Sequence, residues 1–256
     1  MSTPRPVLWE ELTWPQIAAL RDAGTDIVIL PVGATEQHGK HLPTGVDTFS
    51  AVAVAHGVSA RTGIPVLPAL NYGCSLGHSP TWPGTLSLRP EILSAIVLNI
   101  AEWIHAAGFR RLVMLNGHVT NWAPLRCGLE NIRHTYPDLR VNITSLWDIS
   151  KRISEVYHRD ARGFHANAAE TSVMLHLRPD LVHRDQIVDE PDRSACCFFS
   201  YRVDQESVTG ITGSPSLATA PVGAELLAWC IDEFSQRLEK ARRERTPLEE
   251  FSPEIP

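Results

Sequence analysis

The sequence lacks several features that mark particular classes of protein. Its five cysteines include no C-x-x-C pair, and their odd number does not suit a framework of disulfides. It has no run of about 18 apolar residues, the length that a membrane-spanning helix needs. The segment Met1–Pro6 lacks the apolar core of a signal peptide. These absences predict a protein of the reducing cytoplasm that does not act in a membrane.

An excess of positive charge is also missing. The formal net charge is −6 and the pI is about 6.0, so no general basic surface is expected to hold a phosphate backbone. Nucleic acid is therefore not an expected partner. No internal repeat or low-complexity linker divides the 256 residues, and the 43% hydrophobic content suffices for a substantial core. A single domain over residues 1–256 is predicted.

Apolar segments typical of strands alternate with segments typical of helices. One predicted strand begins at Ile27, and three more span residues 64–70, 111–115 and 140–146. The predicted helices span 14–23, 48–61, 90–107, 121–136, 168–177 and 222–243. Residues 178–220 have no clear periodicity. This alternation predicts an α/β fold in which helices cover both faces of a mostly parallel sheet, as in a three-layer sandwich.

Polar residues follow the first predicted strand closely. Glu36 and His38 lie two residues apart, so in an extended backbone they point to the same side. The glycines and the proline beyond them can bring Asp47 back toward the pair. Carboxylates and imidazoles together suit divalent ions that accept oxygen and nitrogen ligands. We predict a metal site here, with a polar surface loop as the alternative reading.

Two further segments can contribute to the same site. His118 stands just beyond the strand 111–115 and can project over the same edge of the sheet as Glu36. Glu170 falls in the first turn of the helix that begins near residue 168, where a carboxylate also serves as a cap. His165, ahead of that helix, is free to point into a site. The other eight histidines are read as surface or packing residues: His41, His56, His78, His105, His134, His158, His176 and His183.

The segment 71–88 is a long loop rich in turn formers, and such loops are often functional. Within it, Gly73-Cys74-Ser75-Leu76-Gly77 matches the G-x-S-x-G pattern of serine hydrolases. That pattern should lead from a strand into a helix, whereas the prolines that follow Ser75 resist a helix. The match is therefore read as accidental, with a serine esterase using Ser75 kept as an alternative.

Four groups of residues, in this order along the chain, resemble the creatininase (creatinine amidohydrolase) family. They are Glu36-Gln37-His38-Gly39 with Asp47, Pro83-Gly84-Thr85, Asn116-Gly117-His118 with Asn121, and His165-Ala166 with Glu170-Thr171-Ser172. The resemblance implies a creatininase-like α/β fold, two divalent metal ions (zinc, manganese or iron) and hydrolysis of an amide-type C–N bond in a small-molecule substrate. It also implies a homo-oligomer, often a hexamer.

The resemblance further implies that Glu36 and His118 bind one ion, that His38 binds the other and that Asp47 bridges both. Creatininase has an additional carboxylate ligand where this chain has Thr120, and we expect Glu170 to replace it. These ligands predict a metal-dependent amidohydrolase with a metal-bridging hydroxide.

Creatininase also has a tryptophan where this chain has Ala161, so creatinine is not the expected substrate. A cyclic amide, a formamide or a small peptide remains. We expect His165 to protonate the departing nitrogen, and Trp82 and Trp147 to wall the substrate pocket. A non-catalytic metal-binding member of the family is the last alternative, because Thr120 replaces a ligand.

Overall fold

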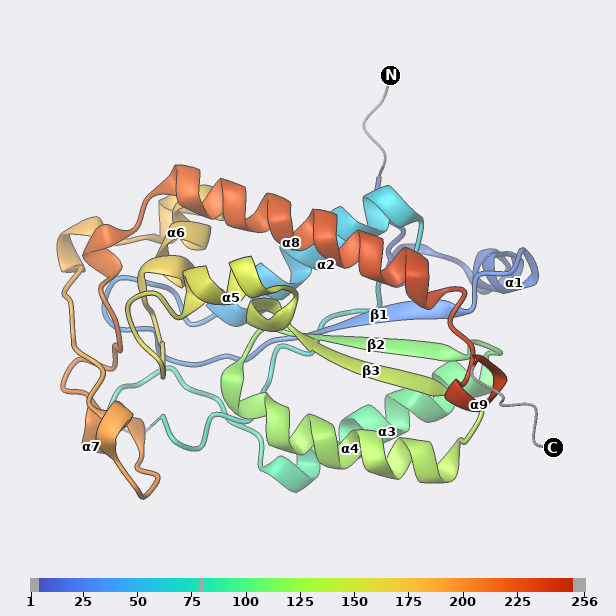
Figure 1. The fold of residues 1–256 in the computed structure, drawn as a ribbon, viewed down its shortest axis with the longest axis horizontal. Coiled ribbons are helices and arrows are strands. Elements are labelled where there is room, and N and C mark those ends of the chain that lie inside the picture. Colours follow the sequence, from blue (N-terminus) through green and yellow to red (C-terminus); the bar gives the residue numbers. More distant parts are fainter. Residues whose placement is uncertain (1–4, 79–80, 251–256) are drawn as a thin grey trace.

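The computed structural model describes residues 5–78 and 81–250. Strands and helices alternate along the chain (Figure 1). The strands are β1 (Ile27–Val32), β2 (Arg111–Asn116) and β3 (Arg140–Ser145). The helices are α1 (Trp14–Asp22), α2 (Val46–Thr62), α3 (Pro90–Ala106), α4 (Trp122–Thr135), α5 (Lys151–Tyr157), α6 (Ala168–Leu177), α7 (Val203–Glu206), α8 (Ala220–Ala241) and α9 (Pro247–Glu250). Short 3₁₀ turns lie between several of them.

The three strands form one parallel sheet in the order β1-β2-β3. The register pairs Val32 with Asn116 and Asn116 with Ser145. The carboxyl ends of all three strands therefore lie side by side, and the loops that follow them leave from one margin of the sheet. Ligands of open α/β sheets bind at this margin.

The segment 64–70 is not the continuous strand that the sequence predicts. Val66 and Leu70 make only single bridges to β1. Pro65 and Pro68 have no N–H group to donate, so a regular hydrogen-bonded ladder cannot form along this segment. It lies beside β1 as irregular backbone.

Helices cover both faces of the sheet and make three layers, with α2, α5, α6 and α8 on one face and α3 and α4 on the other (Figure 1). Strand side chains point alternately to the two faces. Ile29 therefore joins the core under α2 and α8, while its neighbour Leu30 joins the core under α3 and α4. Burial on both faces explains why β1 is apolar throughout. The predicted α/β sandwich is confirmed.

Helix α2 begins at Val46, two residues earlier than the sequence pattern indicates. Asp47 thus lies in the first turn of a helix and not in the loop before it. The partial positive charge at a helix N-terminus favours a carboxylate there. Because the side chain is carried by a helix, its direction is fixed by packing of the whole element.

The C-terminal third contains little regular structure before its last long helix. Residues 178–219 form 3₁₀ turns and the short α7, in keeping with their lack of periodicity. Helix α8 begins at Ala220, two residues before the predicted start at Val222, because the hydroxyl of Thr219 accepts the N–H of Val222 and caps the helix. It ends at Ala241, not at the predicted Arg243.

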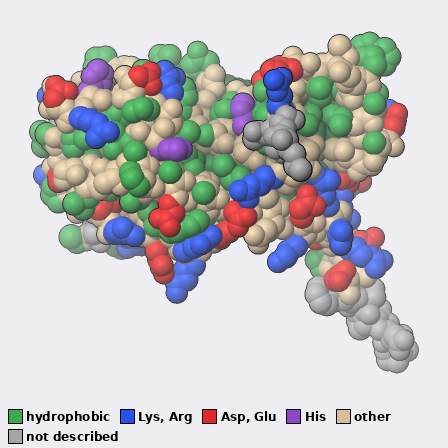
Figure 2. Space-filling model, turned by 90° about the horizontal axis from the view of Figure 1, so that it is seen from above, with side chains coloured by type: hydrophobic (Ala, Val, Ile, Leu, Met, Phe, Trp, Pro, Cys, Tyr) green, Lys and Arg blue, Asp and Glu red, His purple; other side chains and the backbone are tan. Residues whose placement is uncertain are grey.

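Figure 2 shows one face of the molecule, on which basic and acidic side chains alternate with hydrophobic ones. Neither sign of charge prevails over that face, which is consistent with the small net charge. In the described part of the chain, no helix has the length and apolar character required to cross a bilayer.

Candidate metal centre

Four of the predicted side chains meet beyond the ends of the strands. Glu36 and His38 follow β1, His118 follows β2, and Asp47 projects from the first turn of α2. One oxygen of Asp47 lies 3.3 Å from Nε2 of His38, and the other lies 3.3 Å from Nδ1 of His118. Oε1 of Glu36 lies 3.2 Å from the same Nδ1 of His118. The carboxylate of Asp47 therefore stands between the two imidazoles.

Two glycines permit this close approach of α2 to the strand ends. A Cβ at Gly33 would lie 2.5 Å from the Cα of Thr48, and a Cβ at Gly117 would lie 2.4 Å from the carbonyl oxygen of Asp47. Both contacts involve backbone atoms, which cannot move aside cheaply. The glycine between Asn116 and His118 is thus required to bring Asp47 and His118 together.

Glu170 reaches the centre from α6. Asn167 caps this helix by accepting the backbone N–H of Glu170, and Oε2 of Glu170 accepts the backbone N–H of Ala166 at 2.6 Å. One atom each of Glu170, His38 and Asp47 falls within 4.8 Å of the others. Glu170 therefore bonds to the backbone at the start of α6 and also lies beside the centre.

The described residues form three groups of side chains that could each hold a metal ion. They are Glu36, Asp47 and His118; His38, Asp47 and Glu170; and Glu36, His38 and His165. The first two groups share Asp47 alone, so two neighbouring ions could occupy them together with Asp47 as a bridge. The third group takes one acid and one imidazole from the other two and adds His165.

Backbone carbonyl oxygens determine which nitrogen of three imidazoles carries hydrogen. A carbonyl oxygen only accepts, so the nitrogen beside it must donate. The contacts are Nδ1 of His38 to Glu36 O at 3.1 Å, Nε2 of His118 to Cys74 O at 3.1 Å, and Nε2 of His165 to Gln37 O at 2.8 Å. In each neutral ring the other nitrogen then holds a lone pair, and that nitrogen faces a carboxylate.

A lone pair aimed at a carboxylate is unfavourable unless a cation lies between them. Both carboxylate oxygens of Glu36, Nε2 of His38 and Oδ2 of Asp47 are buried and make no hydrogen bond to any described residue. Buried polar atoms are normally satisfied, so such a concentration of exceptions needs an explanation. Nitrogen and carboxylate oxygen ligands suit zinc, manganese and iron. The donor set therefore fits a metal ion.

In the absence of a metal ion, protons occupy the centre. Burial opposes a charge on His38 and on His118, but the carboxylates beside them outweigh burial and raise the pKa to about 10 for His38 and about 9 for His118. Burial raises the pKa of Glu170 to about 7. Burial, aided by the charge on His38, holds the pKa of His165 well below its usual value. His165 is consequently neutral near pH 7.

His165 and Glu170 are the members of the centre that are only partly buried. The side chain of His165 is 13% exposed, compared with 4% for His118 and 0% for Glu36 and His38.

Sequence reasoning missed two residues of the centre, His78 and Gln37. His78 is buried, and its Nε2 lies 3.3 Å from Oε2 of Glu36. The amide of Gln37 lies 3.1 Å from a ring nitrogen of His78 and of His165. His78 is therefore not a surface residue, and its place in the long turn-rich loop 71–88 was the available signal. Residues 79 and 80 of that loop lie outside the described residues. His41 is also buried, where it contacts the hydroxyl of Thr171.

The two tryptophans expected to wall the pocket lie in different surroundings. Trp147 is almost fully buried in the core, where it packs against the rings of Tyr157 and Phe164. Trp82 is partly buried in the loop 71–88. Their contact with a substrate stays a prediction.

Ser75 and Thr120 lie on the opposite side of His118 from the acids. Oγ of Ser75 is 3.1 Å and Oγ1 of Thr120 is 2.6 Å from Nε2 of His118. Ser75 is buried, and a turn follows it in place of the helix of a nucleophile elbow. Because Nε2 donates toward the carbonyl of Cys74, it is not free to take a proton from Ser75.

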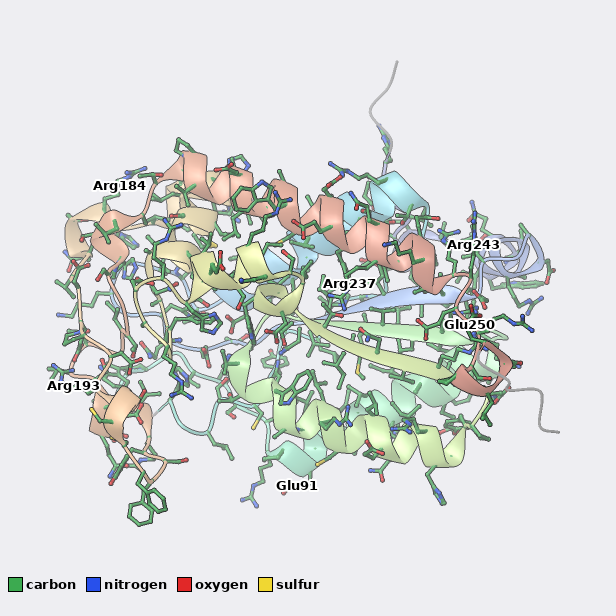
Figure 3. All side chains as sticks on the ribbon, viewed as in Figure 1. Glu91, Arg184, Arg193, Arg237, Arg243 and Glu250 are labelled. Atoms are coloured by element: carbon green, nitrogen blue, oxygen red, sulfur yellow. The ribbon has the colours of Figure 1, made fainter. Side chains whose placement is uncertain are left out.

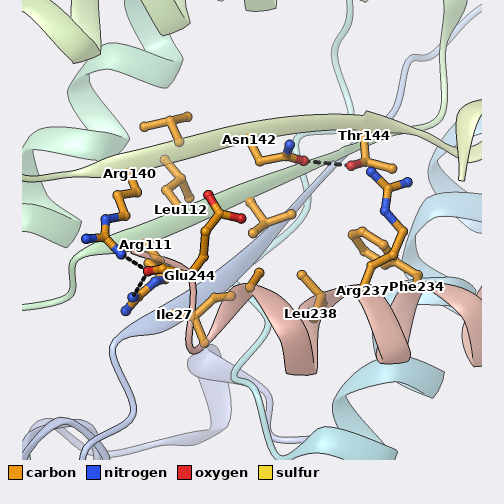
Figure 4. Close-up of a pocket in the computed structure, with 13 residues that line it drawn as sticks. Ile27, Arg111, Leu112, Arg140, Asn142, Thr144, Phe234, Arg237, Leu238 and Glu244 are labelled. Atoms are coloured by element: carbon orange, nitrogen blue, oxygen red, sulfur yellow. Dashed lines mark hydrogen bonds between the residues drawn. The ribbon is translucent and has the colours of Figure 1, made fainter. Parts of the chain in front are cut away.

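A hollow of about 210 Å³ lies between the sheet and α8, and it extends from the amino ends of the strands, at Arg111 and Arg140, along β3 to Thr144 (Figure 4). Arg111, Arg140 and Arg237 line it, and Arg237 extends from α8 (Figure 3). Arg111 and Arg140 donate to the backbone carbonyl of Glu244, and Arg111 pairs with Asp26. Arg237 donates to two backbone carbonyl oxygens. These cations are already paired within the fold.

Comparisons with known proteins agree on one family. The family model "Creatininase: Creatinine amidohydrolase" matches residues 10–238. The chain is 34% identical to a creatinine amidohydrolase of Pseudomonas putida over 93% of this chain and 96% of that protein. It is 32% identical to a mycofactocin precursor peptide peptidase of Mycolicibacterium smegmatis over 87% of this chain and 88% of that protein.

Two solved structures are similar over nearly their whole length. A mutant creatininase of the Zn–Zn type superposes with a TM-score of 0.83 at 30% identity, covering 93% of this chain and 99% of that one. A manganese creatininase gives a TM-score of 0.79 at 30% identity, covering 93% and 100%.

Proposed function

Because this chain belongs to the creatininase (creatinine amidohydrolase) family, we propose that it is a metal-dependent amidohydrolase that cleaves a C–N amide bond. The observation that carries the proposal is the set of three imidazole nitrogens that face the buried carboxylates of Glu36 and Asp47. Such a set requires a proton or a metal ion between each imidazole and its carboxylate, and its nitrogen and oxygen atoms suit a divalent metal ion.

Two divalent ions would be held at this centre. Glu36 and His118 would bind one ion, His38 and Glu170 the other, and Asp47 would bridge them. Glu170 then supplies the carboxylate that Thr120 cannot. Zinc, manganese and iron all accept this mixture of ligands, and similar solved structures are described as zinc and manganese forms.

Such ions, when bound, lower the pKa of a water molecule to make hydroxide available and polarise a substrate carbonyl. His165 would move the proton. Its neutral Nδ1 faces the centre and can accept a proton from the attacking water, then pass it to the departing nitrogen. The Nε2–H of His165 stays bonded to the carbonyl of Gln37, which fixes the direction of the ring.

The proposed substrates are small cyclic amides, formamides and short peptides. The similar proteins include a creatinine amidohydrolase and a peptidase, whose names imply cleavage of a C–N bond in different substrates. Ala161 occupies the position of a creatininase tryptophan, which argues against creatinine. Trp82 and Trp147 are proposed as pocket walls. We further propose a single-domain homo-oligomer, such as a hexamer, in a reducing cytoplasm, in keeping with five free cysteines.

Metal analysis combined with an amide panel tests the proposal. We expect the purified protein to contain zinc, manganese or iron and to hydrolyse at least one cyclic amide, formamide or short peptide. Chelation should abolish turnover, and the added metal should restore it. A protein that binds no transition metal and turns over substrate regardless would refute the proposal. Metal-dependent thermal stability without turnover on any amide would favour a non-catalytic member of the family.

A serine esterase is the second candidate, because Ser75, His118 and the acids stand in a row. The spacing is 3.1 Å from Ser75 to His118 and 3.2 Å from His118 to Glu36, which resembles a catalytic triad. The carbonyl of Cys74 opposes this role by fixing Nε2 of His118 as a donor. A serine-directed covalent probe should leave Ser75 unlabelled. Labelling of Ser75, with ester hydrolysis that survives chelation, would instead support the esterase.

A further inference from the structure

His78 is a fourth imidazole beside Glu36, and neither proposed ion group uses it. Oε1 of Glu36 faces His118 at 3.2 Å and His165 at 3.5 Å. Oε2 faces His78, whose Nε2 lies 3.3 Å away. The side chain of Glu36 is fully buried and that of His78 is 5% exposed, so bulk water does not reach this contact. Nε2 of His78 presents either a lone pair or a hydrogen to Oε2 of Glu36, depending on the tautomer of the ring.

The side-chain amide of Gln37 determines which tautomer His78 adopts. Its Nε2 has two hydrogens and lies near three atoms that could accept them. These are the carbonyl oxygen of Gly210 at 2.9 Å, Nδ1 of His78 at 3.1 Å and Nε2 of His165 at 3.1 Å. Nε2 of His165 already donates to the backbone carbonyl of Gln37 at 2.8 Å, so it cannot also accept. The two amide hydrogens therefore go to Gly210 and to His78.

Since Nδ1 of His78 accepts, Nε2 of the neutral ring carries the hydrogen and lies 3.3 Å from Oε2 of Glu36, although this contact does not have the geometry of a hydrogen bond in this structure. This is the reverse of His38, His118 and His165, whose inner nitrogens hold lone pairs. The difference arises from the partner: an amide N–H fixes His78, while carbonyl oxygens fix the other three rings.

We propose that His78 is a positioning residue whose Nε2–H holds the outer oxygen of Glu36, so that the inner oxygen alone is presented to the metal ion. The inference rests on the proposed function, because it assigns Glu36 as a ligand. A carboxylate without such a donor can rotate or bind through both oxygens, and partners of this kind orient ligands and tune the metal. Gln37 is the residue that fixes the tautomer of His78.

The amide of Gln37 is itself held in place by the C-terminal third of the chain. Its Oε1 accepts the N–H of Gly39 at 2.9 Å. A Cβ on Gly210 would lie 2.3 Å from this oxygen, so only glycine fits there. The N–H of Gly210 donates to Oγ of Ser207, and that hydroxyl contacts the buried carboxylate of Glu190. A segment without a periodic sequence pattern thus determines the orientation of His78.

Two substitutions at His78 distinguish the effect of its N–H donor from the effect of replacing its ring. His78→Gln places an amide N–H near the position of the original Nε2, while His78→Leu removes the donor. His56→Leu on α2, remote from the centre, is the control. We would measure the dissociation constant for Zn²⁺ by competition with a chromophoric chelator and record the visible spectrum of the Co²⁺ form. Thermal unfolding of the metal-free variants checks that each one folds.

We expect His78→Leu to weaken Zn²⁺ binding by about 10- to 100-fold and to change the Co²⁺ spectrum. His78→Gln should recover most of the affinity, and His56→Leu should match the parent. Nitrogen NMR of ¹⁵N-histidine-labelled protein should show hydrogen on Nε2 of His78, assigned by the signal that His78→Gln removes.

Equal affinity of His78→Leu and the parent would overturn this inference alone, as would a folded His78→Gln that binds as weakly as His78→Leu. Hydrogen on Nδ1 of His78 would also overturn it. A parent protein that binds no metal would instead overturn the proposed function, and the inference with it.

Discussion

The two margins of the sheet both carry charged side chains, but in opposite states. At the carboxyl ends of the strands, buried acids and imidazoles face one another, and several of their atoms make no hydrogen bond to the described residues. At the amino ends, Arg111 and Arg140 line an open hollow and donate to the backbone carbonyl of Glu244, and Arg111 also pairs with Asp26. Nε of Arg111 is an exception, since it is buried without a partner.

The difference separates groups that stabilise the fold from groups kept for a ligand. An arginine paired with carbonyl oxygens has its bonding capacity used within the chain, so it needs no further partner. Buried acids and imidazoles whose atoms make few hydrogen bonds are destabilising in the free protein and persist where a function requires them. The unsatisfied margin is therefore the one to which chemistry is assigned, although the hollow of about 210 Å³ lies elsewhere.

Substitution of Asp47, the proposed bridging acid, should have the largest effect on metal content and activity. We expect Asp47→Ala to remove both ions and to lower kcat/KM by more than about 100-fold, because loss of a shared ligand should exceed the loss of an outer partner. Metal analysis and single-substrate kinetics measure both effects. The control is Asp138→Ala, at an exposed ion pair with Arg110. Retention of two ions in Asp47→Ala would contradict the assignment.

A smaller change should follow from Glu170→Gln, which keeps the shape of the side chain and its capping position. We expect one bound ion per chain in place of two, since only the group with His38 loses a carboxylate. Titration with Zn²⁺ in the presence of a competing chelator counts the ions. Glu155→Gln, on the exposed face of α5, is the matched control. Two ions of unchanged affinity would show that Glu170 acts only as a cap.

Metal affinity should also depend on pH, with a sign set by the protons that the ions replace. The pKa of His38 is raised to about 10 and that of His118 to about 9, so both rings are protonated near pH 7 in the metal-free protein. Each ion must displace a proton, and we expect affinity to fall roughly tenfold per pH unit as pH is lowered from about 9.

Calorimetry in buffers of different ionisation enthalpy measures the protons released on binding. We expect release of about two protons when both ions bind near pH 7. Binding without proton release would show that the imidazoles are neutral before the ions arrive. A pH-independent affinity between pH 6 and 8 would lead to the same conclusion.

The smallest effect is expected at Arg237, which lines the same hollow and donates to two carbonyl oxygens just beyond β3. Arg237→Met removes two hydrogen bonds to backbone carbonyls but keeps the apolar part of the side chain against the sheet. We expect the free energy of unfolding to fall by about 1 kcal/mol, with unchanged metal content and kcat. Urea denaturation and metal analysis check this prediction. A loss of metal would show that the hollow and the metal centre are coupled.

Much of the fold could be predicted because it follows from local patterns. The apolar run of β1 and the helical period of α3 specify elements that neighbouring residues determine. The failure at 64–70 has a local cause too, since Pro65 and Pro68 prevent a ladder although the segment is apolar. The start of α2 was less predictable, because Val46 and Asp47 become helical where α2 packs against the strand ends.

Some site residues could also be predicted from local patterns, while the roles of others depend on contacts between distant parts of the chain. Glu36, His38 and His118 stand just beyond predicted strands, and a parallel sheet brings such positions to one margin, so their meeting could be anticipated. His78 stands in a loop without period, and no local pattern indicates where its ring points. Gln37 lies inside the recognised segment, but its importance arises from contacts with residues distant in the chain.

The sequence by itself determined the class of fold, the margin at which acids and imidazoles gather, and the family to which the chain belongs. These follow from periodicity, strand order and short motifs, which are local in the chain. Only the tertiary structure decided which imidazole nitrogens carry hydrogen, because each tautomer is set by a donor or an acceptor that folding brings close. That choice separates three rings able to bind a cation from His78, which holds a ligand in place.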